Sequence, residues 1–144
     1  MPPSTPVFNP RETGSDYFWY AARITGLSSA APTGSAIISL DSDSDFYCIA
    51  TSYQADIAGA ALTESGNLIP LVNVQVTDTG SGKALMNTPI PIGALAGDGK
   101  RPYRLARPRV FLANATLQLA FTSYVAAGTT YNITFVLHGY KVYR

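Results

Sequence analysis

Few residues of this chain have the chemistry of a catalytic site. Nucleophilic catalysis needs a nucleophile, a base within reach and a group that orients the base. His138, the one histidine, alternates with Val136 and Tyr140 as in a β-strand, so we interpret it as a structural residue that faces a packed layer or a subunit contact. Cys48, the one cysteine, lies in the apolar run 46–49, where burial raises the pKa of a thiol and makes it inert. We therefore expect a protein without enzymatic activity.

The segment 41–45 places three carboxylates, those of Asp41, Asp43 and Asp45, at alternate positions. A curved loop with this spacing can direct three carboxylates at one cation, as calcium-binding loops do. The EF-hand pattern fails here, because Phe46 stands at its glycine position and Ser52 at its glutamate position. In a straight strand the carboxylates would instead share one solvated face. We expect a solvated edge or a negative contact patch, keep an ion site as the alternative, and predict no cofactor.

Half of the basic residues fall within ten positions: Lys100, Arg101, Arg104, Arg107 and Arg109. Such a cluster could neutralise nucleic-acid phosphates, with Tyr103 stacked on a base. However, Pro102 and Pro108 make the segment an irregular edge, and arginine forks suit the carboxylates of a neighbouring protein. We predict a protein contact or internal ion pairs, and no nucleic acid as partner. In an extended segment Arg101, Arg107 and Arg109 would share one face, opposite Arg104.

Four consecutive aromatic residues stand near the start of the chain: Tyr17, Phe18, Trp19 and Tyr20. They could form a platform for a sugar ring. In a β-strand they would instead alternate between the core and an interface. We favour core plus interface and keep carbohydrate binding as the alternative.

The elements that must position these residues have the period-two pattern of β-strands. Apolar Val72, Val74 and Val76 alternate with polar residues, and so do Leu117 and Leu119. We predict strands at 17–20 with 23–24, 35–40, 46–53, 72–77, 116–122 and 131–143. The one helical candidate is 54–63. Seven or eight short strands separated by turn signals predict an all-β fold, a jelly-roll-like antiparallel β-sandwich.

Composition and charge favour one domain that is partly covered by other protein. Of the 144 residues 47% are hydrophobic and 13% are charged, against about 25% charged in ordinary globular chains. This excludes intrinsic disorder and leaves few charges to cover a free-standing globule. Residues 1–80 carry a balance of −6 and residues 81–144 one of +7, which suits contacts between neighbours or within one fold.

We divide the chain into an extended Pro-rich N-terminal arm, residues 1–15, and a single β-sandwich domain, residues 16–144. The prolines of the arm exclude a helix or a central strand there. No stretch approaches the roughly 20 apolar residues of a membrane span, and residues 1–6 lack the features of a signal peptide. We therefore expect synthesis in a cytosol and no membrane as partner.

Three segments carry a resemblance to a known family: RPYR at 101–104, PRVFLANATL at 108–117 and YNITFVLHGYKVY at 131–143. With a Pro-rich arm before a small all-β body, the chain resembles the small jelly-roll cement or decoration proteins of tailed bacteriophages, of the Bordetella phage type. The resemblance lies mainly in residues 100–144.

This resemblance implies a structural virion protein, made in the host bacterial cytoplasm, that binds the capsid exterior. It implies a homodimer or homotrimer that bridges subunits of the major capsid protein and stabilises the shell. A carbohydrate- or receptor-binding β-sandwich module of a virion is the alternative. Our own expectation for the contact takes residues from the arm and the basic cluster: Pro6, Phe8, Arg11, Arg101, Arg104, Arg107 and Arg109.

Overall fold

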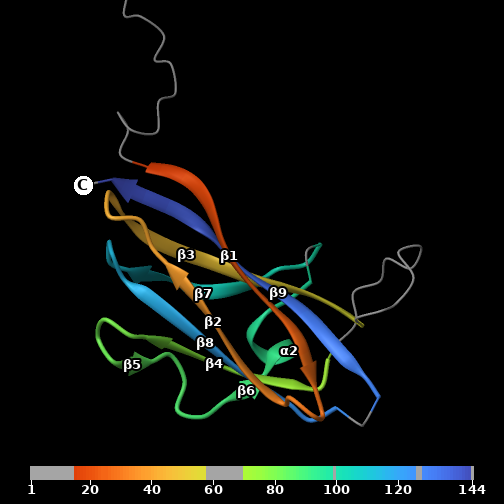
Figure 1. Cartoon of the computed structure of the whole chain (residues 1–144). Coiled ribbons are helices and arrows are strands. Elements are labelled where there is room, and N and C mark those ends of the chain that lie inside the picture. Colours follow the sequence, from red (N-terminus) through yellow and green to blue (C-terminus); the bar gives the residue numbers. More distant parts are fainter. Residues whose placement is uncertain (1–14, 58–69, 99, 126–127, 144) are drawn as a thin grey trace, which may run out of the picture.

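The computed structural model describes residues 15–57, 70–98, 100–125 and 128–143 (Figure 1). In chain order its elements are β1 (Ser15–Ser28), β2 (Thr33–Ser39), β3 (Ser44–Ile57), β4 (Val72–Asp78), β5 (Lys83–Ala84), β6 (Ile90–Pro91), α2 (Ile92–Leu95), β7 (Tyr103–Phe111), β8 (Thr116–Ser123) and β9 (Thr130–Tyr143). Residues 1–14 of the expected arm lie outside the described residues, and Ser15 already belongs to β1. Among the described residues no helix is long and apolar enough to cross a membrane.

The strands form two antiparallel sheets that pack face to face. Sheet A has the order β1-β9-β3-β7, and sheet B has the order β2-β8-β4-β5, with β6 also paired to β4. The pairing is nested: β1 pairs with β9, β2 with β8, β3 with β7, and β4 with β5 and β6, and successive pairs alternate between the sheets. A long hairpin wrapped over two sheets in this way is a jelly roll. The predicted all-β, jelly-roll-like sandwich is confirmed.

Several details of the secondary structure differ from the prediction, and β5, β6 and β7 lie outside every predicted strand. Three strands, β1, β3 and β9, are 14 residues long, and β3 continues through Ile57. The helical candidate 54–63 is therefore wrong for 54–57, because Tyr53 and Ala55 continue the buried alternation and pair with β9. The rest of that candidate, 58–63, lies outside the described residues. The single turn α2 was not predicted, and its Ile92 is fully buried.

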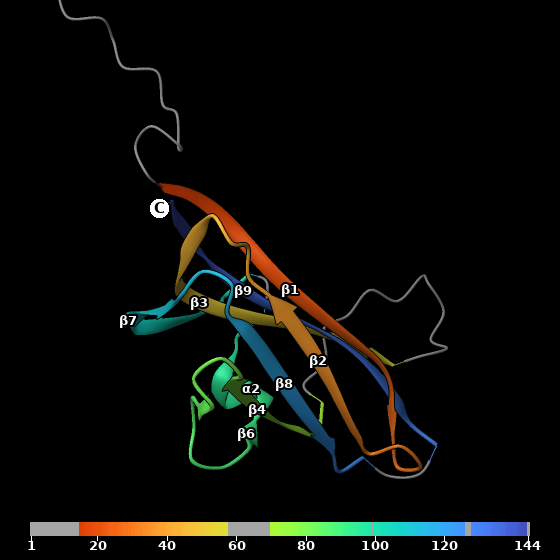
Figure 2. The ribbon, with the colours of Figure 1, turned by 60° about the vertical axis from the view of Figure 1, so that its left-hand side comes forward.

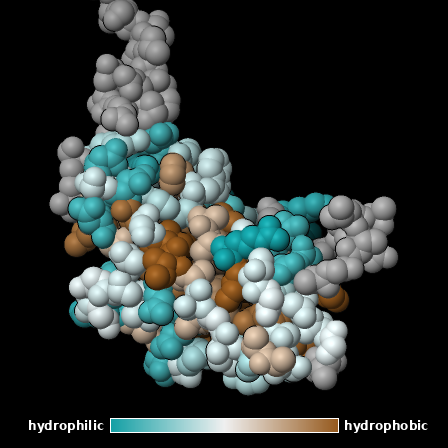
Figure 3. Space-filling model, in the orientation of Figure 1, coloured by the Kyte–Doolittle hydropathy of each residue, from teal (hydrophilic) through white to brown (hydrophobic). Residues whose placement is uncertain are grey.

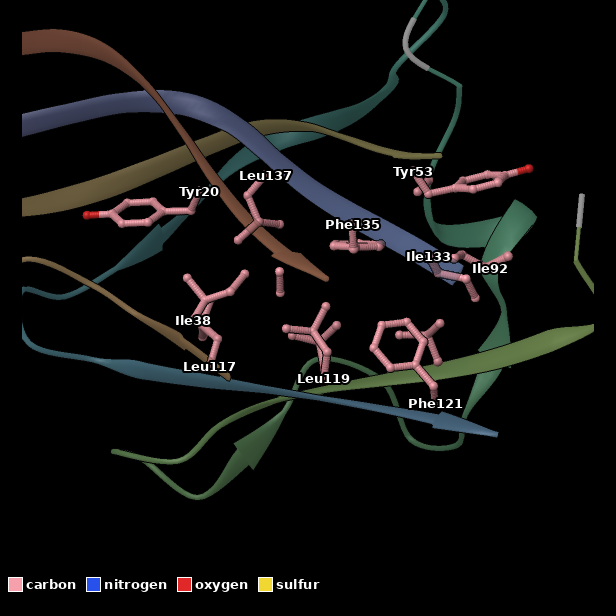
Figure 4. Close-up of a cluster of buried hydrophobic side chains, with 14 of the residues drawn as sticks. Tyr20, Ile38, Tyr53, Ile92, Leu117, Leu119, Phe121, Ile133, Phe135 and Leu137 are labelled. Carbon is pink, nitrogen blue, oxygen red and sulfur yellow. The ribbon is translucent and has the colours of Figure 1, made fainter. Parts of the chain in front are cut away.

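The core lies between the two sheets (Figure 4). From β9, Ile133, Phe135 and Leu137 point toward sheet B, and from β8, Leu117 and Leu119 point toward sheet A. Each of these side chains is at most 5% exposed, so the alternation along β8 and β9 fixes which face of each strand meets the other sheet. The outward residues of both strands are less buried, which leaves one face of each sheet for contacts.

The two edges of the sandwich are covered differently. At one edge β1 and β2 lie together, whereas β7, α2, β4 and β6 lie toward the other side (Figure 2). A fourth full strand of sheet B would cover β7, but this place is taken by β5 and β6, of two residues each, and by α2. We call the first the closed edge and the second the open edge.

Candidate functional site

The outer surface of sheet A carries a row of aromatic and aliphatic side chains that crosses all four strands. The register aligns Tyr17 with Tyr140, Tyr140 with Tyr47, and Tyr47 with Val110. The rings of Tyr47 and Tyr140 stack, with centroids 5.2 Å apart and planes inclined by 18°. At the two ends of the row Tyr17 is 70% and Val110 42% exposed. A solvent-facing row of this kind is unusual on a free monomer.

A second row lies beside the first and crosses the same four strands, with a β-bulge between the rows on β3. It aligns Trp19 with His138, His138 with Ala50, and Ala50 with Arg104. Trp19 is 60% exposed. Between the rows is a hollow of about 220 Å³, whose lining includes Tyr17 and these four residues. We call the two rows together the aromatic face.

The aromatic face exists because β1 alternates strictly. Phe18 and Tyr20 point into the sandwich, where their rings meet edge to face at 4.7 Å, and Tyr17 and Trp19 point outward. The predicted alternation of core and exposed aromatics is thus confirmed for this segment. What covers the outward half, an interface or a sugar, stays a prediction.

His138 of β9 links the two strands that flank it, β1 and β3, through its ring nitrogens. Trp19 Nε1 donates a hydrogen bond to His138 Nδ1 at 3.0 Å, and His138 Nε2 lies 2.6 Å from Ser52 Oγ. An indole N–H can only donate, so Nδ1 is the acceptor and the neutral ring carries its proton on Nε2. His138 therefore donates to Ser52. Burial lowers the pKa of His138, which favours this neutral form.

The Ser52–His138 contact has the spacing of a nucleophile and its base, but its polarity is wrong. A base must accept the serine proton at the nitrogen that faces it, and a carboxylate must accept from the other nitrogen. Here the nitrogen facing Ser52 holds the proton, and a donor, Trp19, occupies the other one. Ser52 is also only 4% exposed. The hydrogen-bonded pair of Ser52 and His138 positions Trp19 on the aromatic face. It could not be predicted from the sequence, because Ser52 and His138 are 86 residues apart.

The three carboxylates of segment 41–45 do not converge. Asp41 forms an ion pair with Lys141, Asp43 accepts a hydrogen bond from Ser44 Oγ at 3.1 Å, and Asp45 accepts one from the Ala113 amide at 2.8 Å. Within the described ranges no group of three or more histidine, cysteine or acidic side chains is placed to hold a metal. The described geometry therefore gives the ion-site alternative no support. Asp41 precedes the turn from β2 to β3 and Asp43 lies in it, so the chain bends where a shared strand face would have been needed.

Lys141 is the inward-facing cation of β9 and is 6% exposed. Its ammonium lies 3.9 Å from the ring centroid of Phe18 and pairs with Asp41. Burial acts to lower the pKa of Lys141, but the hydrogen bond and charge of Asp41, with Tyr20 and Asp43 nearby, outweigh it and raise the pKa above its usual value. This pair locks the turn after β2 onto the end of β9.

The basic cluster is divided between two surfaces. Arg104 lines the hollow on the aromatic face, whereas Arg107 and Arg109 line a pocket that opens between the sheets. Arg101 lies exposed in the turn before β7, where its amide donates to Asp98 at 2.7 Å. The segment is the edge strand β7 of sheet A, as its prolines indicated. The arm residues expected at the contact, Pro6, Phe8 and Arg11, lie outside the described residues.

The pocket at the open edge has a volume of about 400 Å³ and reaches inward from β7 to the central strand β9. Cys48 lines it at depth, 1% exposed, and burial raises the pKa of its thiol to about 11. The burial expected for this cysteine is thus confirmed. We call this cavity the open-edge pocket.

Comparison with known proteins adds no relative. No protein-family model matches the chain, and neither does any curated protein or any solved structure. What the chain does must therefore be inferred from its own residues.

Proposed function

We propose that this protein is a structural virion protein that binds the outside of an assembled phage capsid and stabilises it by bridging subunits of the major capsid protein. The observation that carries the proposal is the aromatic face. Four of its eight aligned residues are tyrosine or tryptophan, and one is an arginine, Arg104. These are the residue types enriched at the centres of protein interfaces. The hydrogen bond between Ser52 and His138 does not have the direction that a nucleophile and its base require, so this pair suggests no competing catalytic role.

The outer surface of sheet A, of which the aromatic face is a part, is large enough for a specific protein contact. Sheet A has four strands spaced about 4.8 Å apart, and its long strands rise about 3.3 Å per residue over 14 residues. With nine residues in β7, the outer surface of the whole sheet is roughly 800 Å², which is the area per partner of a standard interface. A ligand that contacts two shell subunits binds the assembled shell more tightly than the loose subunit. Mass action then stabilises the shell.

Sedimentation tests the role directly. Native material from the producing cells is separated on a gradient, and each fraction is analysed by mass spectrometry. We expect co-migration with large particles at a fixed ratio to one shell protein. A protein found only in the light fractions would contradict the proposal.

Substitutions test the surface. We expect Trp19→Ser with Arg104→Glu to abolish binding to purified shells while the far-ultraviolet circular dichroism stays unchanged. Ile37→Ser is the matched control, because Ile37 is 62% exposed on the outer face of sheet B. Deletion of residues 1–14 tests the arm separately. Equal shell binding by the double variant and the control would refute the assignment of the aromatic face.

Carbohydrate binding is the second candidate, and the hollow between the aromatic rows favours it. Tyr17 and Trp19 line the hollow beside the polar groups of Arg104 and His138. Trp19 is the one tryptophan of the chain, so its fluorescence reports on this hollow alone. A saturable fluorescence change with a glycan, lost in Arg104→Glu, would support sugar binding. No response across a glycan panel, with or without calcium, would exclude it.

A further inference from the structure

We propose that the open-edge pocket binds a small amphipathic monoanion, with an apolar tail between the sheets and a carboxylate at Arg107 and Arg109. This site lies on the opposite side of β7 from Arg104, goes beyond the proposed function and does not depend on it.

The pocket forms because the two sheets are unequal at this edge. The inner side of β7 faces the segment from Leu85 to Leu95, which contains only β6 and α2, instead of a full strand. Leu105 of β7 is consequently half-buried, although it points toward the core side. Incomplete cover over apolar side chains leaves a site whose filling by a ligand removes apolar surface from water.

The depth and lining of the pocket suit a single apolar tail. Phe135 and Leu137 of the central strand form its inner end, and Leu85, Met86 and Leu95 form the wall on the side of sheet B. Its volume of about 400 Å³ is within the range of ligand pockets, which are mostly apolar with a few placed polar groups. A pocket that extends from an edge strand to the middle of its sheet admits a narrow chain more readily than a broad protein surface.

The charge at the mouth selects an anion. Arg107 and Arg109 are two residues apart on β7, so their side chains lie on the same side of the strand. Both are exposed, and within the described part of the chain neither has an acidic partner in ion-pair distance. Among the described residues that line the pocket none is acidic, and the Thr51 hydroxyl already donates a hydrogen bond to the Leu95 carbonyl at 2.5 Å. Two adjacent guanidinium forks bind a carboxylate strongly.

Binding of decanoate tests the proposal, with decanol and decyltrimethylammonium as probes of equal tail and different charge. We expect decanoate to raise the unfolding temperature of the full chain saturably and to shift the methyl resonance of Met86. Decanol binds more weakly, and the cation does not bind. Arg107→Gln with Arg109→Gln should weaken decanoate binding about tenfold or more and leave decanol unchanged, because charged hydrogen bonds are lost.

Arg104→Gln is the matched control, since it removes an arginine of the same strand from the other side; it should leave decanoate binding unchanged. Three results would overturn the proposal: no decanoate binding, equal affinity for decanoate and decanol, or equal losses in the control and the double variant. Self-association that the double variant abolishes, without decanoate binding, would show that a second copy fills the pocket and would also overturn it. Shell binding is measured separately, so either proposal can fail alone.

Discussion

The closed edge and the open edge of this sandwich differ in how completely their inward-facing side chains are covered. At the closed edge the Tyr20 ring packs edge to face on Phe18 and Phe46, with ring centroids 4.7 and 4.8 Å apart. The Tyr20 hydroxyl accepts a hydrogen bond from the Asp41 amide. At the open edge Arg107 and Arg109 stand at the mouth of a pocket of about 400 Å³. The first edge contributes stability, and the second leaves surface free for a ligand.

Figure 3 adds that the closed edge is not uniformly polar outside. Hydrophobic residues gather over β2 and the neighbouring part of β1, with hydrophilic residues around them. Ile37 of β2, on the outer side of sheet B, is 62% exposed. A well-packed edge can therefore still present apolar surface outward, which is why Ile37 is the control for the aromatic face.

The largest expected effect comes from truncating one side chain at each edge. Ile38 of β2 is 4% exposed and lies beside Leu117 of β8 in the core (Figure 4), so Ile38→Ala should lower the free energy of unfolding by about 3 kcal/mol. Leu105 of β7 is half-buried beside the open-edge pocket, so Leu105→Ala should cost about 1 kcal/mol. Urea unfolding measures both. Equal losses would mean that the two edges are packed alike.

The next effect distinguishes the partners of the ion pair at the closed edge. Asp41→Asn leaves the buried ammonium of Lys141 without its counter-charge, so we expect a loss of about 2 kcal/mol. Lys141→Met leaves the Asp41 carboxylate, whose side chain is 52% exposed, in contact with water, so the loss should be about 1 kcal/mol or less. Chemical unfolding of the two variants at one pH compares them. A larger loss in Lys141→Met would contradict this assignment.

Much of the fold could be predicted from the sequence, because alternation specifies both faces of a strand. Val72, Val74 and Val76 of β4 and Leu117 and Leu119 of β8 are all buried, as their spacing indicated. The extension of β3 to Ile57 was missed, since the bulge between Cys48 and Ala50 interrupts the alternation along the strand. Only the pairing of β3 with β9 decides it.

The candidate site was only partly predictable. Trp19 and Arg104 were singled out separately, but the row that joins them depends on the order of strands in sheet A. The Ser52–His138 contact was missed for the same reason, since a strand register is set by tertiary pairing. The open-edge pocket has no sequence signal at all, because it arises where a strand is replaced by shorter pieces.

A smaller effect concerns the outer side of the closed edge, where Trp19 ties β1 to His138 of β9. Because burial lowers the pKa of His138, the folded protein binds its proton at a lower pH than the unfolded chain does. The contribution to stability is therefore complete above about pH 6.5 and is lost as the pH falls through the folded pKa. We expect this loss in the free energy of unfolding to be smaller than the two losses above.

Trp19 fluorescence measures this titration, since the imidazolium cannot accept the indole hydrogen bond. The fluorescence midpoint should lie below pH 6.5 and should disappear in His138→Gln. A midpoint at or above pH 6.5, or one that persists in His138→Gln, would show that another group is responsible.

The smallest effect is on the alkylation rate of Cys48, which compares how readily the two edges open locally. Cys48 lines the open-edge pocket, yet it is 1% exposed, and burial raises the pKa of its thiol to about 11. At pH 8 about one thiol in a thousand would be ionised, so alkylation in the native state should be slow. Leu105→Ala should accelerate the alkylation of Cys48, and the rate should depend little on denaturant, because β7 opens locally. Ile38→Ala should accelerate it only through global unfolding, with a steep denaturant dependence. If both variants showed the steep dependence, the open edge would be no more mobile than the closed one, and a ligand would reach the pocket only through unfolding.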